Sequence, residues 1–92
     1  MISFSDNSGR SMKDAIKVTG AKTHYESVIA EQEYIKKLYN GAGIEYSIAE
    51  QVLLKDGKKV FDVVKIDFAD GTNSTLFFDI TEPYNKFVIY PQ

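Results

Sequence analysis

The strongest periodic pattern along the chain predicts one amphipathic helix over about residues 24–39. Thr23 and Glu26 have the spacing of a capping box, in which each side chain satisfies a free backbone N–H group at the helix start. The pair Asn40-Gly41 then predicts a left-handed residue that ends the helix. The apolar side of this helix is predicted to hold Tyr25, Val28, Ile29, Gln32, Ile35, Leu38 and Tyr39, and we expect Val28, Ile35 and Leu38 to be buried against a sheet.

Three alternating segments follow the helix and predict strands over about residues 44–54, 59–68 and 72–81. Their connections, at residues 55–57 and 69–71, each contain Asp-Gly, which is typical of two-residue hairpin turns. A two-residue loop at Asp56-Gly57 would pair even-numbered residues with odd ones and mix the apolar side chains with charged ones. A three-residue loop with Gly57 or Gly71 in the third, left-handed position pairs even with even, so we predict that loop in both hairpins.

This loop length fixes a register in which the even-numbered residues form the more apolar face of the sheet. We therefore expect the helix to pack on the even face and the odd face to be the second face. The predicted cross-strand pairs are Tyr46–Ile66, Ile48–Val64, Val52–Val60, Val64–Leu76, Ile66–Ser74 and Val63–Phe77.

The remaining segments are shorter. Residues 15–18 alternate like a strand, although a helical turn capped by Ser11 is the competing interpretation. Residues 1–11 are small and polar, and we predict a flexible N-terminal tail on a single domain of residues 1–92. The aromatic segment 87–90 is predicted either to form an edge strand or to cover part of the sheet.

Together these elements predict the α+β class, with one helix packed on an antiparallel sheet of three to five strands. The order of strand, helix and antiparallel meander resembles the cystatin-like architecture in topology. The inhibitory motif of that family, Gln-x-Val-x-Gly, is not matched by residues 51–55, where Gln-Val-Leu-Leu-Lys lacks the central valine and the closing glycine. Protease inhibition is therefore not expected, because a shared topology alone does not assign function.

Composition narrows the functional classes. The chain has no cysteine, which excludes disulfides, thiolate metal sites and a cysteine nucleophile and favours the cytoplasm. No signal peptide or membrane span is visible at the start or along the chain. The net charge is −2 with scattered lysines, so we expect neither a nucleic acid nor a membrane as a partner. No metal or cofactor motif is present, and an enzyme is less expected than a binding protein.

The second face of the predicted sheet is the main functional candidate. It should be polar if it only met water, yet Val63 and Phe77 form an apolar row with Ala49, and Phe61 and Leu53 extend that row. Such a patch is typical of an interaction surface. Leu53, Phe61, Val63 and Phe77 are thus predicted to bind a protein partner or a second copy of the chain, unless the ends of the chain cover them.

A pocket between helix and sheet is the alternative candidate. In the predicted register Glu50 faces Asp62, and paired carboxyl groups in a partly buried cleft can perform acid–base chemistry on a small ligand near Tyr46. A bulge near Ala49 would instead turn Glu50 outward. His24, the only histidine, is expected to be a solvated side chain in the first turn of the helix.

Overall fold

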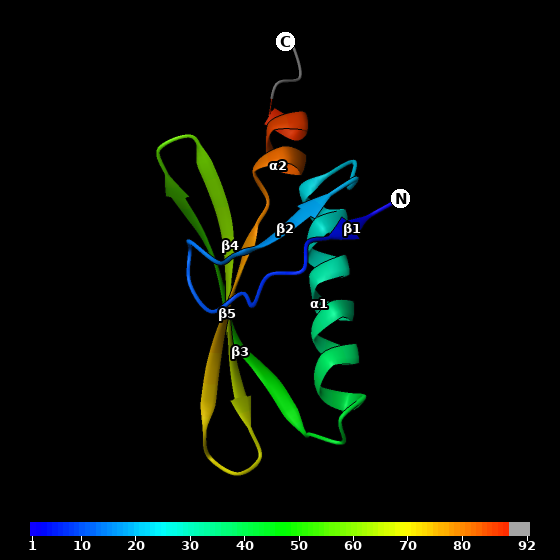
Figure 1. The fold of residues 1–92 in the computed structure, drawn as a ribbon, viewed down its shortest axis with the longest axis vertical. Helices are drawn as coiled ribbons and strands as arrows, with labels where there is room; N and C mark the ends of the chain where they lie inside the picture. The colour runs from blue at the N-terminus through cyan, green and yellow to red at the C-terminus, as the bar shows by residue number, and fades with distance from the viewer. Residues whose placement is uncertain (89–92) are drawn as a thin grey trace.

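The fold is taken from a computed structural model that describes the backbone of residues 1–88 and the side chains of residues 1–85. Over these residues it has one long helix on one face of a twisted five-stranded sheet, as Figure 1 shows, with strand order β1-β2-β5-β4-β3. The α+β class predicted from the sequence is confirmed. The elements are β1 (Ser3–Phe4), β2 (Ile16–Thr19), α1 (His24–Asn40), β3 (Tyr46–Asp56), β4 (Lys59–Phe68), β5 (Asn73–Asp79) and α2 (Thr81–Val88).

Helix α1 begins where the capping box predicts it. The Thr23 hydroxyl accepts a hydrogen bond from the Glu26 N–H group at 3.1 Å, and the Glu26 carboxylate accepts one from the Lys22 N–H group at 2.9 Å. The predicted helix end is wrong in one respect, because Gly41 keeps a helical φ of −61°. The left-handed residue is Gly43, at φ +74°, two positions further on.

The N-terminal part of the chain completes the sheet. Residues 16–19 form β2, as the alternating pattern predicts, and β2 pairs in parallel with β5, which makes the otherwise antiparallel sheet mixed. Residues 1–11 do not form the predicted loose tail, because Ser3–Phe4 forms β1 and pairs with β2. The short apolar sequence around Phe4 packs against the core, which holds this segment in place.

The second hairpin, β4–β5, has the predicted register. Val64 lies opposite Leu76, Ile66 opposite Ser74 and Val63 opposite Phe77. The three residues 69–71 close this hairpin, and Gly71 has the expected positive φ, at +90°. Because the sequence pattern is unbroken on both strands, parity alone is enough to define this hairpin.

The first hairpin, β3–β4, differs from the prediction. Asp56 lies opposite Lys59, so the loop is the two residues Gly57-Lys58, and a bulge at Ala49 shifts the register between Ile48 and Glu50. Gly57 has the expected positive φ, at +63°, at the first loop position, as in a type II′ turn. The observed pairs include Tyr46–Phe68, Ile48–Ile66, Glu50–Lys65, Val52–Val63, Leu53–Asp62 and Leu54–Phe61.

The bulge reverses the two faces of β3 halfway along the strand. Before it, the even residues Tyr46 and Ile48 face the helix, and after it the odd residues Gln51, Leu53 and Lys55 do so, because directly opposed residues point to the same face. The three-residue loop predicted from parity is therefore wrong. A two-residue loop combined with one bulge places Tyr46 and Ile48 on the helix side of the sheet, just as the predicted three-residue loop would.

The core lies between α1 and the even face of β4 and β5, as predicted. Its buried cluster consists of Ile16, Val18, Ile35, Val60, Val64, Ile66, Leu76, Phe78 and Ile80. Of the three helix residues expected there, Ile35 is buried, Val28 is partly buried and Leu38 is exposed. The helix is rotated by about a quarter turn from the predicted orientation, since Ser27 and Glu31 are buried while Tyr25 and Ile29 are exposed.

The described backbone of the C-terminal segment is helical and does not form the predicted edge strand. Residues 81–88 form α2, which contacts α1, β2 and β4, and the Tyr84 side chain packs against the core on the helix side of the sheet. The predicted segment 87–90 lies partly outside the described residues. Asp79 begins this turn, because its carboxylate accepts hydrogen bonds from the Thr81 N–H group at 3.0 Å and the Thr81 hydroxyl at 2.6 Å.

Candidate interaction surface and buried acidic cluster

The second face of the sheet carries an apolar row across three strands. Val63 lies opposite Phe77 on β5 and opposite Val52 on β3, so these three side chains share one face. Leu54 and Phe61 form a second opposed pair beside them. We call these five residues, Val52, Leu54, Phe61, Val63 and Phe77, the apolar row.

The structure brings most of the predicted patch together and corrects one member. Phe61, Val63 and Phe77 lie in the apolar row, but Leu53 points to the helix side because of the bulge at Ala49. Its place on the second face is taken by Val52 and Leu54. Phe61 is only 2% exposed within the single chain, and Val63 and Phe77 are partly buried. The accessible part of the row therefore shifts toward β3, where Val52 is 46% and Leu54 is 37% exposed.

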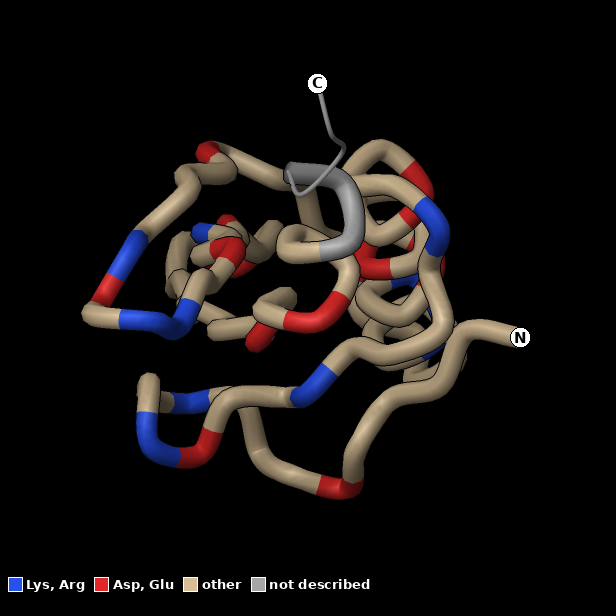
Figure 2. The backbone as a smooth tube through the Cα atoms, turned by 90° about the horizontal axis from the view of Figure 1, so that it is seen from above, with Lys and Arg blue, Asp and Glu red and all other residues tan. Residues whose placement is uncertain are grey.

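Charged side chains border the apolar row at both ends. Glu50 lies opposite Lys65 at one end, and at the other end the Lys59 Nζ atom lies 3.9 Å from the Asp79 carboxylate. Figure 2 shows that lysine and arginine alternate with acidic residues along the backbone rather than gathering on one side. An apolar centre with a mixed polar rim is the usual anatomy of a protein interface.

Strand β3 adds a second feature to this surface, because it is an edge strand. It has no neighbour on its outer side among the described residues, whereas the opposite edge of the sheet is formed by the two-residue strand β1. Proteins usually protect a long edge by charge, proline or a covering segment, since its free backbone groups can pair with another strand. Here residues 52–54 are Val-Leu-Leu, and all three are exposed.

A buried acidic cluster lies on the other side of the sheet, between α1 and β4. The His24 Nε2 atom lies 3.3 Å and 3.4 Å from the two carboxylate oxygens of Asp62, which is almost fully buried. Gln51 on β3 donates a hydrogen bond from its Nε2 atom to the Glu31 Oε1 atom at 3.1 Å. His24 is therefore half-buried and paired with a carboxylate, not the solvated side chain expected from the sequence.

Burial makes Glu31 a neutral acid. The pKa of Glu31 is raised from 4.5 to about 10, first by burial and then by the hydrogen bond and negative charge of the neighbouring Asp62. The Glu31 Oε2 atom is buried, and no N–H or O–H group of the described residues donates to it, so it can carry the proton and share it with Asp62. The cluster thus joins the neutral carboxyl group of Glu31, the buried Asp62 side chain and the partly exposed His24 imidazole.

The predicted alternative pocket does not assemble. Asp62 belongs to the buried cluster, but Glu50 points to the second face opposite Lys65, as expected if a bulge turns it outward. Tyr46 lies at the other end of β3, with its ring centroid 5.7 Å from that of Tyr39. The register that brought Glu50 and Asp62 together was wrong, so a shared acid–base site of these two carboxyl groups is excluded.

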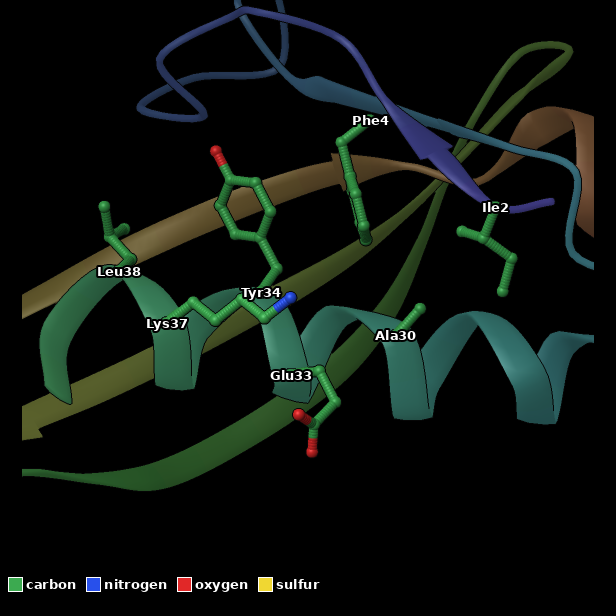
Figure 3. Close-up of a pocket in the computed structure, with 7 residues that line it drawn as sticks. All are labelled: Ile2, Phe4, Ala30, Glu33, Tyr34, Lys37 and Leu38. Carbon is green, nitrogen blue, oxygen red and sulfur yellow. The ribbon is translucent and has the colours of Figure 1, made fainter. Parts of the chain in front are cut away.

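An apolar groove of about 450 Å³ lies between β1 and α1, and no pattern in the sequence predicted it. Figure 3 shows Ile2 and Phe4 above the helix, with Tyr34 beside Phe4 and Leu38 at one end of the groove. The Phe4 and Tyr34 ring centroids are 4.8 Å apart, and burial, followed by the charge of Asp6, raises the pKa of Tyr34. The groove depends on β1, which the sequence pattern had indicated to be part of a loose tail.

Comparisons with family models, with curated proteins and with solved structures found no match to this chain. Among the described residues, no helix is both long and apolar enough to cross a membrane. The same part of the chain contains no group of three or more histidine and acidic side chains arranged to hold a metal ion.

Proposed function

We propose that this protein is an interaction module that binds a protein partner, or a second copy of itself, through the second face of its sheet. The observation that carries the proposal is the apolar row, which crosses β5 and β4 and ends in two exposed side chains, Val52 and Leu54, on the edge strand. An aromatic and β-branched row is normally placed against another surface.

Two further observations support a protein as the partner. The rim of the row carries both signs of charge, at Glu50 with Lys65 and at Lys59 with Asp79, which suits a polar protein surface better than a polyanion or an anionic membrane. The chain's own C-terminal helix packs on the other side of the sheet, and Val52 and Leu54 at the end of the row stay exposed to a partner. The cysteine-free composition supports a cytoplasmic location.

The test compares the wild type with Val52→Lys, which places a charge in the accessible part of the row. Ile29→Lys is the matched control, because Ile29 is 44% exposed on α1 and Val52 is 46% exposed on β3. Each protein is immobilised and incubated with a lysate of its source cells, and each is also analysed by sedimentation over a range of concentrations. Circular dichroism confirms that both variants remain folded.

We expect the wild type and Ile29→Lys to bind the same partner or to self-associate, and Val52→Lys to lose about tenfold or more in affinity. Phe77→Asp, at the centre of the row, should have at least as large an effect. Equal binding by Val52→Lys and the wild type would contradict the proposal. So would a wild type that captures no partner and stays monomeric.

A further inference from the structure

We infer that two copies of this chain join through their β3 strands, which pair antiparallel about Leu53 and continue the sheet from one copy into the other. This inference rests on the proposed function, because it names the partner and the geometry of the same surface. It begins from the free edge of β3 in the described part of the chain, on which residues 52–54 expose apolar side chains to both sides of the sheet.

The backbone of β3 offers a regular pairing segment with a defined centre. The bulge at Ala49 and the turn at Gly57 limit the regular part of the strand to residues 50–56, and Leu53 is its middle residue. In a ladder closed by a two-residue loop, the closing pair is hydrogen-bonded and alternate residues turn their backbone groups outward. Counted from Asp56, the outward residues are Lys55, Leu53 and Gln51.

A two-fold axis through Leu53 uses all of these outward groups. It places Leu53 opposite Leu53 of the second copy, and Gln51 opposite Lys55 of the second copy, so every outward residue meets another outward residue. A centre at residue 52 or 54 would bring the bulge or the turn into the ladder and lose hydrogen bonds. The pairing about Leu53 is therefore the one that satisfies the most backbone groups on this edge.

Side chains on the second face match in the same pairing. Val52 of one copy lies opposite Leu54 of the other, twice by symmetry, so the apolar rows of the two copies join into one continuous stripe. Leu53, which is 41% exposed on the helix side, would be covered by its own symmetry mate. A partner strand must be apolar on both faces to cover residues 52–54, and β3 itself meets this requirement.

Charges at the ends of the pairing segment are compatible with this arrangement. Glu50 of one copy comes opposite Asp56 of the other, which alone would be repulsive. Within each copy, however, Glu50 lies opposite Lys65 and Asp56 lies opposite Lys59 on β4. Across the joined sheets the side chains therefore follow the order Lys65 and Glu50 of one copy, then Asp56 and Lys59 of the other. Each acidic side chain has a basic neighbour in its own copy.

The chain has no cysteine of its own, which makes a disulfide test clean. Val52→Cys and Leu54→Cys are prepared separately, one of them carrying a size tag, and are oxidised alone and as an equimolar mixture. Opposed residues in a non-hydrogen-bonded antiparallel pair have Cα atoms about 4.5 Å apart, within the range of a disulfide. Leu38→Cys, at a similarly exposed apolar position on α1, is the control for random collision.

We expect the mixture to form the mixed disulfide about tenfold faster than either variant forms a homodimer, because only the mixed pair is held in reacting geometry. The Leu38→Cys protein should react slowly. Independently, the Leu53→Pro protein should sediment as a monomer at concentrations at which the wild type is a dimer. The substitution removes an outward N–H group that the strand's own ladder does not use. The Leu53→Ala protein retains that N–H group, so its dimer should be weakened less than that of the Leu53→Pro protein.

The outcomes separate this inference from the proposed function. A dimer that is weakened by Val52→Lys but gives no mixed disulfide would associate through the second face without pairing its β3 strands, which overturns the pairing about Leu53 and leaves the interaction module intact. Preferential homodimers of Val52→Cys or Leu54→Cys would also overturn it, since they indicate a different centre. A wild type that remains monomeric at high micromolar concentration while its lysate partner still depends on Val52 would refute self-pairing alone.

Discussion

Replacing Glu31 by glutamine should stabilise this protein at neutral pH. The carboxyl group of Glu31 is buried, and its pKa of about 10 in the folded state compares with an ordinary value of 4.5. Between these two values the folded protein keeps a proton that the unfolded chain has released. The contribution of Glu31 to stability is therefore fully present below pH 4.5 and is lost progressively as the pH rises toward 10.

The size of this loss follows from the ordinary pKa. Each pH unit above 4.5 costs about 1.4 kcal/mol, so by pH 7 the wild type has lost roughly 3 kcal/mol relative to a neutral side chain of the same shape. Glutamine is such a side chain. Its carbonyl oxygen can accept the hydrogen bond from Gln51, and its amide can donate to Asp62 as the protonated carboxyl group does.

The assay is urea denaturation followed by circular dichroism at a series of pH values, with the wild type and Glu31→Gln measured in parallel. Their difference in unfolding free energy should be near zero at pH 4.5 and should grow by about 1.4 kcal/mol per pH unit up to about pH 9. Glu33→Gln, an exposed substitution on the same helix, should show no such growth. A difference for Glu31→Gln that stays constant with pH would refute the buried neutral acid.

Other predictions concern the core and the turns. Ile35→Ala should lower the unfolding free energy by about 2–5 kcal/mol in chemical denaturation, because Ile35 is fully buried, and a loss below about 1 kcal/mol would mean that α1 is docked in another way. Gly71→Ala should cost about 1 kcal/mol, since its φ is +90° and no atom lies within 4 Å of an added Cβ atom. Gly9→Ala should cost more than Gly71→Ala in the same assay, because it adds to a φ of +77° a close contact at 2.8 Å with the buried Ile16 side chain. Equal losses at the two glycines would show that the loop around Gly9 moves away from the sheet without cost.

The structure also explains why the predicted face of the helix was wrong. Local periodicity identified the side with Tyr25 and Ile29, but α1 turns Ser27 and Glu31 toward the sheet instead. A buried glutamate is acceptable there only because Gln51 and Asp62, from two different strands, come to the same place. No spacing within the helix could reveal partners that are supplied by β3 and β4.

What the sequence determined by itself is local. The capping box at Thr23 defines the start of α1 through hydrogen bonds within one helical turn, and Gly71 defines the second hairpin because left-handed backbone favours glycine. Residue parity then predicted the correct pairing of Val63 with Phe77, because β4 and β5 continue without a bulge. These features require no information beyond neighbouring residues and an unbroken strand.

Only the tertiary structure decided which residues in the second half of β3 point to the helix side and which point to the second face. Parity cannot distinguish a three-residue loop from a two-residue loop preceded by a bulge in β3, since both keep Tyr46 and Ile48 on the helix side. The bulge at Ala49 sends Leu53 to the helix side and brings Val52 and Leu54 to the second face, and it separates Glu50 from Asp62. The choice depends on how β3 fits beside β4 and beneath α1, where Gln51 reaches Glu31, and that fit is set by contacts between residues far apart in the chain.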